Sequence, residues 1–306
     1  MQPAWRRNLG HALRRWRRAF KAALPYVRRR EYAKVLRKYD LLTTSLGMGL
    51  RRADEAQLVA RKPCRTRLTG DVCVFLSYQP SPALKPHVAT HIEHLLAQGI
   101  TVVLVLNTPL PPEAVTLDPQ LEERLAAVYV RENTGFDFAG WAHVHAVLAP
   151  LLDPMRLFLV NDSIVGPLDA ASFAAVVGRI RASAADVIGL TEALAPTRHL
   201  QSFFLVFGRR ALPELASFFA DVLCFDDKGT VIDVYETQLT LRAQRAGLAC
   251  EALFPALSDD PWASNDTFFR WPELIRAGFP YIKTSVLAEQ GEDPELKELV
   301  PARFRP

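Results

Sequence analysis

The chain has 306 residues, of which 49% are hydrophobic and 23% are charged, so it can bury a sizeable core and is not a disordered protein. The net charge of +4 hides a division: residues 1–70 contain 19 Lys and Arg against 4 Asp and Glu, whereas residues 71–306 contain 18 against 29. The four cysteines show no short paired spacing, so the sequence indicates neither a zinc ribbon nor a disulfide framework, and a reducing, cytosolic compartment is the expectation.

A basic amphipathic helix is predicted at the start of the chain. Arginines occupy most of one face, and six large apolar residues share the other: Trp5, Leu9, Leu13, Trp16, Phe20 and Leu24. Such a helix fits the headgroup region of an anionic membrane, so we expect residues 1–24 to bind that surface and residues 1–67 to form a basic helical arm. Three alternatives remain: the helix docks on the protein's own core, it binds nucleic acid, or it is an organellar transit peptide.

The first unit of the folded body is predicted to be a strand, a helix and a strand. Residues 72–76 and 100–106 are apolar runs typical of buried strands, and residues 88–98 have helical periodicity. A βαβ unit implies parallel strands and a ligand crevice above the first strand. The first turn contains no dinucleotide fingerprint and no phosphate-binding Gly-Lys-Ser/Thr loop, which disfavours dinucleotide and ATP binding. The loop at residues 77–82 is therefore the expected base-binding edge.

Three histidines of this predicted helix are spaced four and three residues apart: His87, His91 and His94. That spacing places their imidazoles on one helical face, where they can bind a metal ion or face solvent. No Glu accompanies them in a zinc-protease pattern, so the sequence favours the solvent-facing alternative.

Polar residues follow two short apolar runs in the middle of the chain, residues 126–130 and 157–160. Both runs fit buried strands whose ends open into loops. Because the carboxyl ends of strands in an open α/β sheet form the ligand crevice, five residues become candidates for a site: Asn133, Asp137, Asn161, Asp162 and Ser163. Ordinary turns and helix caps use the same residue types. For each segment taken alone, the alternative is therefore a structural turn or cap without a role in binding.

The rest of the chain continues the α/β pattern. Residues 184–192, 199–207 and 248–254 are expected strands, and residues 212–222 and 234–247 are expected helices. Glu236 lies in the first turn of the second of these helices, where an acidic residue also suits the helix dipole. Towards the end of the chain, we expect Lys283 to bring an ammonium group near the crevice.

Several ordered motifs become recognisable together: Arg131-Glu-Asn-Thr-Gly-Phe-Asp-Phe-Ala-Gly-Trp141, Asn161-Asp-Ser-Ile-Val-Gly-Pro167, Gly189-Leu-Thr-Glu192, His199-Leu-Gln-Ser-Phe-Phe204, Tyr235-Glu236, and Trp271 with Phe279-Pro-Tyr-Ile-Lys283. This series, over about residues 71–290, resembles the rhamnan synthesis protein F family, which is associated with rhamnose-containing polysaccharides of bacterial cell surfaces. The same order is also similar to the inverting family-2 glycosyltransferases, whose GT-A fold binds a nucleotide-sugar. The expected fold is therefore α/β: a GT-A-like, Rossmann-type mixed sheet flanked by helices over residues 68–306, after the basic arm.

The resemblance implies a role for each candidate. Glu236 is the expected catalytic base, which takes the proton of the acceptor hydroxyl. Asp162 is the expected ligand of Mg²⁺ or Mn²⁺ at the donor diphosphate, with Arg131 or Lys283 as alternative positive charges. The other donor-binding candidates are Asn133, Asp137 and Ser163, and the acceptor-side candidates are His199 and Gln201. Two departures from the family-2 pattern matter: a single carboxylate replaces the Asp-x-Asp pair, and Gln238 replaces a second acid near Glu236.

These expectations describe a glycosyltransferase, inverting and rhamnosyltransferase-like, that uses a nucleoside-diphosphate sugar, with dTDP-rhamnose favoured, and a polysaccharide or polyprenyl-linked glycan acceptor. The alternative is a catalytically silent GT-A-like protein that binds glycan or scaffolds polysaccharide synthesis. No apolar run reaches the roughly 18 residues that span a bilayer, so we expect a cytoplasmic protein held peripherally at the inner leaflet by its arm. The excess of acidic over basic residues in residues 71–306 disfavours a nucleic-acid partner.

Overall fold

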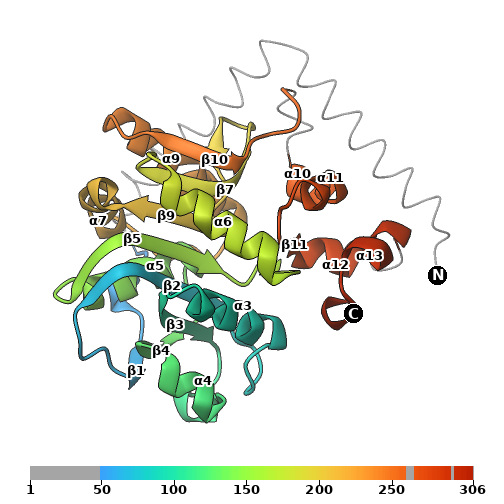
Figure 1. Cartoon of the computed structure of the whole chain (residues 1–306). Helices are drawn as coiled ribbons and strands as arrows, with labels where there is room; N and C mark the ends of the chain where they lie inside the picture. The colour runs from blue at the N-terminus through green and yellow to red at the C-terminus, as the bar shows by residue number, and fades with distance from the viewer. Residues whose placement is uncertain (1–48, 260–264, 291–292, 306) are drawn as a thin grey trace.

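The computed structural model describes residues 49–259, 265–290 and 293–305. The predicted membrane-binding helix at residues 1–24, and the rest of the basic arm up to residue 48, lie outside these residues. Within the described ranges, nine strands form one mixed sheet in the order β1-β4-β3-β2-β5-β9-β7-β10, with β8 paired to β7 (Figure 1). The prediction of a mixed α/β sheet flanked by helices is confirmed.

The centre of the sheet is parallel. The strands β4 (Ala127–Glu132), β3 (Thr101–Thr108), β2 (Leu68–Tyr78) and β5 (Leu152–Asn161) run side by side in one direction. β9 (Phe204–Gly208) lies antiparallel between β5 and β7 (Val187–Ala193), and β10 (Cys250–Phe254) is parallel to β7. β1 (Leu58–Lys62) pairs antiparallel with β4, and a separate ladder joins β6 (Ile164–Val165) to β11 (Ile282–Lys283).

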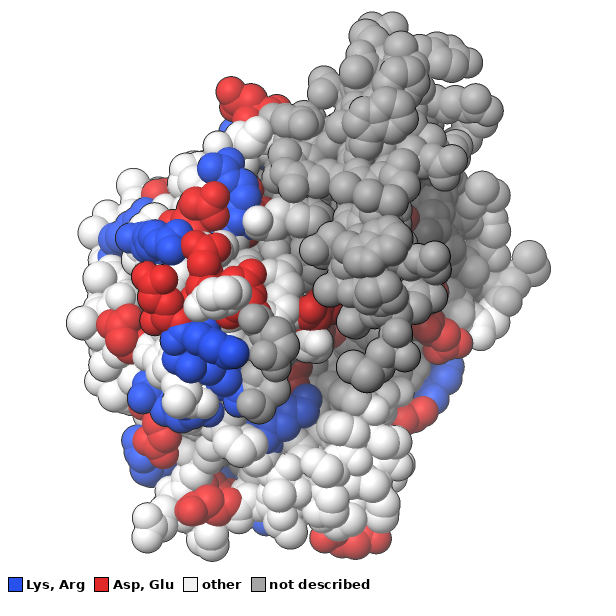
Figure 2. Space-filling view, turned by 90° about the vertical axis from the view of Figure 1, so that its right-hand side faces the viewer, with Lys and Arg blue, Asp and Glu red and all other residues white. Residues whose placement is uncertain are grey.

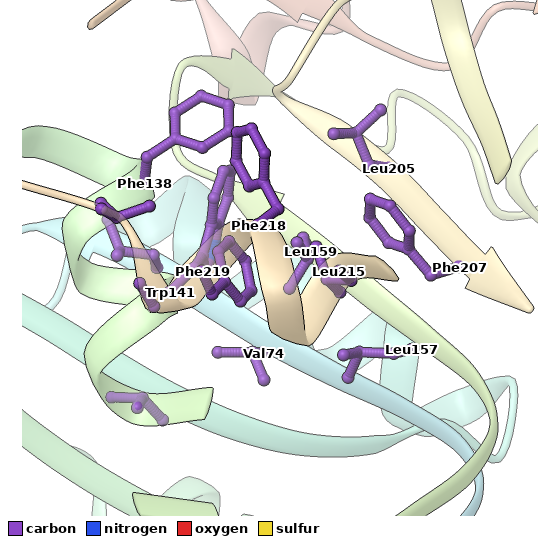
Figure 3. Packing of buried hydrophobic residues seen from close by; sticks show 14 of the residues in the cluster. Val74, Phe138, Trp141, Leu157, Leu159, Leu205, Phe207, Leu215, Phe218 and Phe219 are labelled. Atoms are coloured by element: carbon purple, nitrogen blue, oxygen red, sulfur yellow. The ribbon is translucent and has the colours of Figure 1, made fainter. Parts of the chain in front are cut away.

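Helices cover both faces of the sheet, because side chains along β2 alternate between two apolar layers. Val72, Val74 and Leu76 belong to the layer formed with α5 (Phe136–Leu148), α7 (Leu212–Ala220) and α9 (Thr237–Arg245). Cys73 and Phe75 belong to the layer formed with α3 (Pro86–Ala97), α4 (Pro119–Arg124) and α6 (Ala170–Ala182). Figure 3 shows the first layer, where Phe138 and Trp141 of α5 meet the Phe218–Phe219 pair of α7 over the strands.

The C-terminal segments form a smaller layer beside β6 and β11. The helices α11 (Trp271–Arg276), α12 (Thr284–Gln290) and α13 (Pro294–Leu299) share an apolar cluster that includes Trp271, Val286 and Leu296. Ile282 of β11 and Val165 of β6 belong to the same cluster. This packing holds β11 against the loop that follows β5.

Three boundaries differ from the sequence-based expectations. The folded body begins before residue 68, because Ala53 is buried and β1 pairs with β4; a short, basic edge strand shows no apolar periodicity. The expected strand at residues 199–207 is divided into β8 (His199–Leu200) and β9, because residues 201–203 turn to contact other elements. β5 also starts five residues earlier than expected, at Leu152.

Gly140 allows α5 to lie close to the ends of β2 and β3. A Cβ at this position would lie 2.1 Å from Leu76 Cδ1 and 3.3 Å from both side-chain ends of Asn107. Leu76 is fully buried and has little room to move. Gly140→Ala is therefore expected to lower the free energy of unfolding by about 1–3 kcal/mol through overpacking, measured by urea unfolding.

Gly178 in α6 provides the matched control, because it is exposed and no atom lies within 4 Å of an added Cβ. Gly178→Ala is expected to leave stability unchanged or to raise it by up to about 1 kcal/mol, since Ala restricts the unfolded chain. If the two variants unfold at the same urea concentration, the close approach of α5 to the sheet is not what requires a glycine at position 140.

Candidate active site

The carboxyl ends of β2, β3, β4 and β5 meet at one edge of the sheet. The strand register pairs Leu76 with Asn161, Tyr78 with Asn107, and Asn107 with Arg131. Neighbouring strands are about 4.8 Å apart, so the loops that follow these strands lie side by side. Most of the polar residues singled out in the sequence stand on these loops, as the rule for open α/β sheets predicts.

Asp162 follows β5 and reaches over the end of β2. Its Oδ2 accepts hydrogen bonds from Ser77 Oγ at 2.8 Å and from the Tyr78 N–H at 3.1 Å. The ammonium of Lys85, the residue just before α3, lies 2.6 Å from the same oxygen. The side chain of Asp162 is 12% exposed, so this ion pair is partly shielded from solvent.

Asn161, the last residue of β5, connects this loop to α5. Its Nδ2 donates to Asp137 Oδ2 at 2.8 Å, and its Oδ1 accepts from the N–H and the hydroxyl of Ser163 at 3.0 and 2.7 Å. Asp137 stands in the first turn of α5. Burial and the negative charge of Asp162 raise the pKa of Asp137 to about 7, against the opposing effects of Lys228 and Asn161. Asp137 therefore exchanges its proton near neutral pH.

Glu236 approaches the same region from a wide π-type turn, Ile232–Glu236, that leads into α9. Its Oε2 accepts hydrogen bonds from the N–H of Ser202, at 3.0 Å, and from the Ser202 hydroxyl, and its Oε1 lies 3.5 Å from His199 Nε2. Burial alone would raise the pKa of Glu236, but His199, Ser202 and the charge of Lys283 lower it to about 2. Although burial opposes it, the carboxylate of Glu236 raises the pKa of His199 in return.

Lys283 stands on β11 opposite Ile164 of β6 and thereby flanks the loop that carries Asp162. A hydrogen bond from the Thr284 N–H to the Ser163 carbonyl, at 3.0 Å, fixes this arrangement. The ammonium lies 4.1 Å from the centre of the Phe203 ring. Burial lowers the pKa of Lys283 to about 8, although the carboxylates of Glu236 and Asp137 act to raise it.

The structure thus brings together five residues predicted from the sequence, called the charged cluster below: Asp137, Asp162, His199, Glu236 and Lys283. Ser163 joins it through its hydrogen bonds to Asn161. Gln201 lies next to Ser202, but its Oε1 accepts hydrogen bonds from the hydroxyls of Thr191 at 2.7 Å and Thr267 at 3.4 Å. Its carbonyl end therefore ties β7 to α10 (Asp266–Phe269).

Asn133 and Arg131 lie outside the charged cluster. Asn133 is exposed and lines a hollow of about 540 Å³, together with Thr108 and Glu113 beside the ends of β3 and β4. Arg131 is 1% exposed, and its guanidinium donates to the backbone carbonyls of Glu132, Thr134 and Ala53. The Arg131 guanidinium is therefore committed to the chain itself, unlike the freely available diphosphate-binding charge suggested by the motif.

The three histidines of α3 do not share one environment. His91 is buried among Phe75, Phe204 and Tyr281, and its Nε2 lies 2.8 Å from the hydroxyl of Tyr281. Burial lowers the pKa of His91 to about 3, so this imidazole is a neutral core residue and does not face solvent as the sequence favoured. In the part of the chain that the structure describes, no group of three or more His, Cys, Asp and Glu is arranged to hold a metal ion.

The divalent cation implied by the resemblance does not fit the residues around Asp162. Hard cations such as Mg²⁺ prefer about six oxygen ligands, mostly carboxylates, carbonyls and water. Here Asp162 Oδ2 is already bound by an ammonium group, a hydroxyl and an amide N–H. The neighbouring carboxyl group, that of Asp137, already accepts a hydrogen bond from Asn161 Nδ2 through its Oδ2. These ligands are a poor match for Mg²⁺ or Mn²⁺.

Three residues of the site escaped prediction from the sequence: Lys85, Ser202 and Lys228. Lys85 has one signal, since it is the only basic residue between the ends of β2 and the start of α3 and stands where a helix N-terminus meets the crevice. Ser202 belongs to the motif His199-Leu-Gln-Ser-Phe-Phe204, but the motif does not show its contact with Glu236, which depends on the turn between β8 and β9. Lys228, at the start of α8 (Lys228–Val231), acts on Asp137 and Lys283 through its charge.

The fold and the site define an α/β protein with a charged cluster at the carboxyl edge of its sheet, beside a hollow of the size that small-molecule ligands occupy. The sequence matches the family described as rhamnan synthesis protein F over residues 102–299. The chain belongs to this family.

Two curated relatives are similar to most of the chain. Uncharacterized protein y4gN of Sinorhizobium fredii is 28% identical over 201 residues, which cover 63% of this chain and 50% of the relative. Virulence protein VirA of Vibrio anguillarum is 26% identical over 225 residues, which cover 61% of this chain and 69% of the relative. The chain thus spans about half the length of the Sinorhizobium protein. Among the described residues, no helix has the length and apolar character needed to cross a membrane.

Proposed function

We propose that this protein is a glycosyltransferase that moves a sugar from a nucleoside-diphosphate donor to a cell-surface polysaccharide or a lipid-linked glycan. Family membership supports a role in rhamnan synthesis. Transfer with inversion is proposed from the resemblance of the sequence motifs to those of inverting GT-A enzymes. Rhamnose carried by dTDP is the donor that the proposal favours. The name of the Vibrio relative, a virulence protein, suits a product on the cell surface.

The observation that carries the proposal is the position of the charged cluster relative to the hollow. The hollow lies beside the ends of β3 and β4, and the charged cluster lies beside those of β2 and β5. From β4 to β5 there are three strand spacings of about 4.8 Å, or roughly 14 Å in all. This distance suits an extended nucleotide-sugar with its nucleoside in the hollow, near Asn133, and its diphosphate and sugar near Asp137, Asp162 and Ser163.

Glu236 is the proposed catalytic base. Ser202 fixes Oε2, and the acceptor hydroxyl is proposed to replace His199 at Oε1, where the contact with the imidazole is 3.5 Å long. Because its pKa is about 2, the carboxylate is ionised throughout the physiological range. An acceptor hydroxyl that displaces His199 from Oε1 would remove part of the stabilisation of the charged form, and this strengthens the base.

The acceptor is proposed to meet the enzyme at the inner leaflet of the cell membrane. His199, which contacts Glu236 Oε1, and Gln201, the neighbour of Ser202 in the chain, are the proposed acceptor-side residues. A basic amphipathic arm at residues 1–24 would hold the protein at an anionic surface and raise its encounter rate with polyprenyl-linked glycans.

Binding of the correct donor is expected to raise the thermal stability of the protein. A ligand present at 100 times its Kd adds about 2.7 kcal/mol when it binds the folded state alone. A thermal-shift series with dTDP-, UDP-, GDP- and CMP-sugars identifies the donor. Transfer of a labelled sugar from that donor to a polyprenyl-linked acceptor, in anionic liposomes and in detergent, then tests the reaction and the membrane arm.

The outcomes separate the possible functions. Stabilisation by one donor, with faster transfer in liposomes than in detergent, supports the whole proposal. Stabilisation without transfer favours the alternative, a catalytically silent protein that binds glycan or scaffolds polysaccharide synthesis. A protein that none of these nucleotide-sugars stabilises is not the proposed glycosyltransferase.

A further inference from the structure

Two lysines stand on segments that flank the loop that follows β5. On one side, Lys85 Nζ lies 2.6 Å from Asp162 Oδ2. On the other, Lys283 stands opposite Ile164 in an antiparallel pair, whose Cα atoms are about 4.5–5.5 Å apart. The loop is therefore bracketed by two lysines at the place where the resemblance implies a cation.

Lys283 is a charged group without a close counter-ion. In the described part of the chain, no carboxylate oxygen lies within 4 Å of its ammonium, which rests instead against the ring of Phe203. The pKa of Lys283 falls to about 8 because burial outweighs the attraction of Glu236 and Asp137. A cation that has lost water without gaining a partner is stabilised when an anion enters beside it.

Lys85 stands at the N-terminus of a twelve-residue helix, α3, and no side chain caps that end. Pro86 has no N–H and the N–H of Val88 donates to the Lys85 carbonyl, so the helix dipole, and not a row of free N–H groups, adds partial positive charge to that of the ammonium. Tyr78, 42% exposed, lies under Lys85 with its ring centre 5.5 Å from Nζ. Among the residues drawn in colour on the face shown in Figure 2, basic side chains lie next to acidic ones and do not gather in one broad positive patch.

We propose that Lys85 and Lys283 bind the diphosphate of the donor in place of a divalent cation, an assignment that rests on the proposed function. Two ammonium groups carry the same charge as one Mg²⁺ or Mn²⁺ ion and stabilise the negative charge that develops on a departing diphosphate. An ammonium has three N–H donors, so Lys85 can keep its bond to Asp162 while it donates to a phosphate oxygen. Asp162 then acts as a positioning residue that aims Lys85 into the site.

The test is a calorimetric titration of the full chain with dTDP, and with UDP and GDP, in EDTA and again in Mn²⁺. The Kd of the nucleotide that binds is expected to agree within about twofold in the two buffers. Lys85→Met and Lys283→Met are each expected to weaken binding at least about tenfold, because each loses charged hydrogen bonds to phosphate. Lys297→Met, which removes the same charge from the exposed surface of α13, is the matched control and should bind as the wild type does.

The melting temperature of each unliganded variant shows whether it is folded. Binding that appears with Mn²⁺ and disappears in EDTA would overturn the lysine assignment and leave the proposed function intact. Wild-type affinity in folded Lys85→Met and Lys283→Met would also overturn it. Failure of all three nucleotides to bind in either buffer would instead count against the proposed function, and the assignment would fall with it.

Discussion

Glu236→Gln is expected to lower kcat for sugar transfer by about 10²–10⁴-fold, the range that general-base catalysis contributes. The two side chains have nearly the same shape, and the amide oxygen of Gln can still accept the hydrogen bonds from Ser202. The amide cannot take the proton of the acceptor hydroxyl. The loss should therefore appear in kcat, with a smaller change in KM for the donor, in assays of the purified variant.

The same substitution has a separate effect on stability. The folded protein lowers the pKa of Glu236 from 4.5 to about 2, so the ionised carboxylate contributes stability above pH 4.5 that is lost as the pH falls towards 2. At pH 7 that contribution is at most about 3 kcal/mol, and the variant should be less stable by up to this amount. The difference in stability between the variant and the wild type should be smaller in acid, as urea unfolding at pH 7 and pH 3 would show.

Glu251→Gln provides the control for this substitution. Glu251 lies on β10 and, like Glu236, accepts a hydrogen bond from a serine hydroxyl, that of Ser183, but it is outside the charged cluster. Its replacement should leave transfer unchanged. If folded Glu236→Gln transfers sugar at the wild-type rate, Glu236 is not the base.

The strands that carry the site could be predicted from the sequence because both of their faces are buried. Residues 72–76, 100–106 and 157–160 are continuous apolar runs, and this pattern marks the central strands of a parallel sheet without knowledge of their neighbours. The carboxylates of Asp162 and Asp137 could be predicted for a related reason. Asp162 comes two residues after the run 157–160, and Asp137 stands in the first turn of the helix that follows β4, so their positions depend on local sequence.

Contacts between residues on different strands could not be predicted from the sequence, because they depend on the order of the strands in the sheet. Lys85 and Asp162 are 77 residues apart in the chain and meet only because β5 lies next to β2. Arg131 shows the reverse case. It belongs to a recognisable motif, but the packing of the turn at Ala53 against α5 buries it and commits its guanidinium to carbonyl groups. Sequence alone assigns neither the burial nor the hydrogen bonds of such a residue.

Asp137→Asn is expected to raise the stability of the protein at pH 8 by about 2–4 kcal/mol and to leave it nearly unchanged at pH 4. In the folded protein, burial and the charge of Asp162 raise the pKa of Asp137 from 3.8 to about 7. Because the pKa is higher in the folded state, the protonated carboxyl group contributes its full share of the free energy of unfolding below pH 3.8, where the folded and unfolded states both hold the proton. This contribution is lost as the pH rises through 7. Asn cannot ionise, and its carbonyl still accepts the hydrogen bond from Asn161.

Urea unfolding of both proteins at pH 4, 6 and 8 measures this difference. Asp54→Asn removes a negative charge at an exposed position and controls for net charge. An Asp137→Asn variant that is less stable than the wild type at pH 8 would mean that the carboxylate is held charged in the native protein.

The same proton is expected to control donor binding. A diphosphate that enters between Asp162 and Asp137 meets one negative charge fewer while Asp137 is protonated, so wild-type affinity for dTDP should fall as the pH rises through 7. The other charged groups that act on Asp137 are Asp162, Glu236 and Lys228, and Lys283, with its pKa of about 8, also faces the cluster.

These groups are shared by wild type and Asp137→Asn, so the difference between their two binding profiles isolates Asp137. Calorimetric titrations between pH 6 and 8.5 should show a steeper loss of affinity in the wild type. Parallel profiles would assign the pH dependence to groups other than Asp137: those that both proteins share, or the terminal phosphate of dTDP, which also loses a proton in this range. A carboxyl that stays protonated up to neutral pH therefore lets the site carry three acidic residues and still accept an anionic substrate.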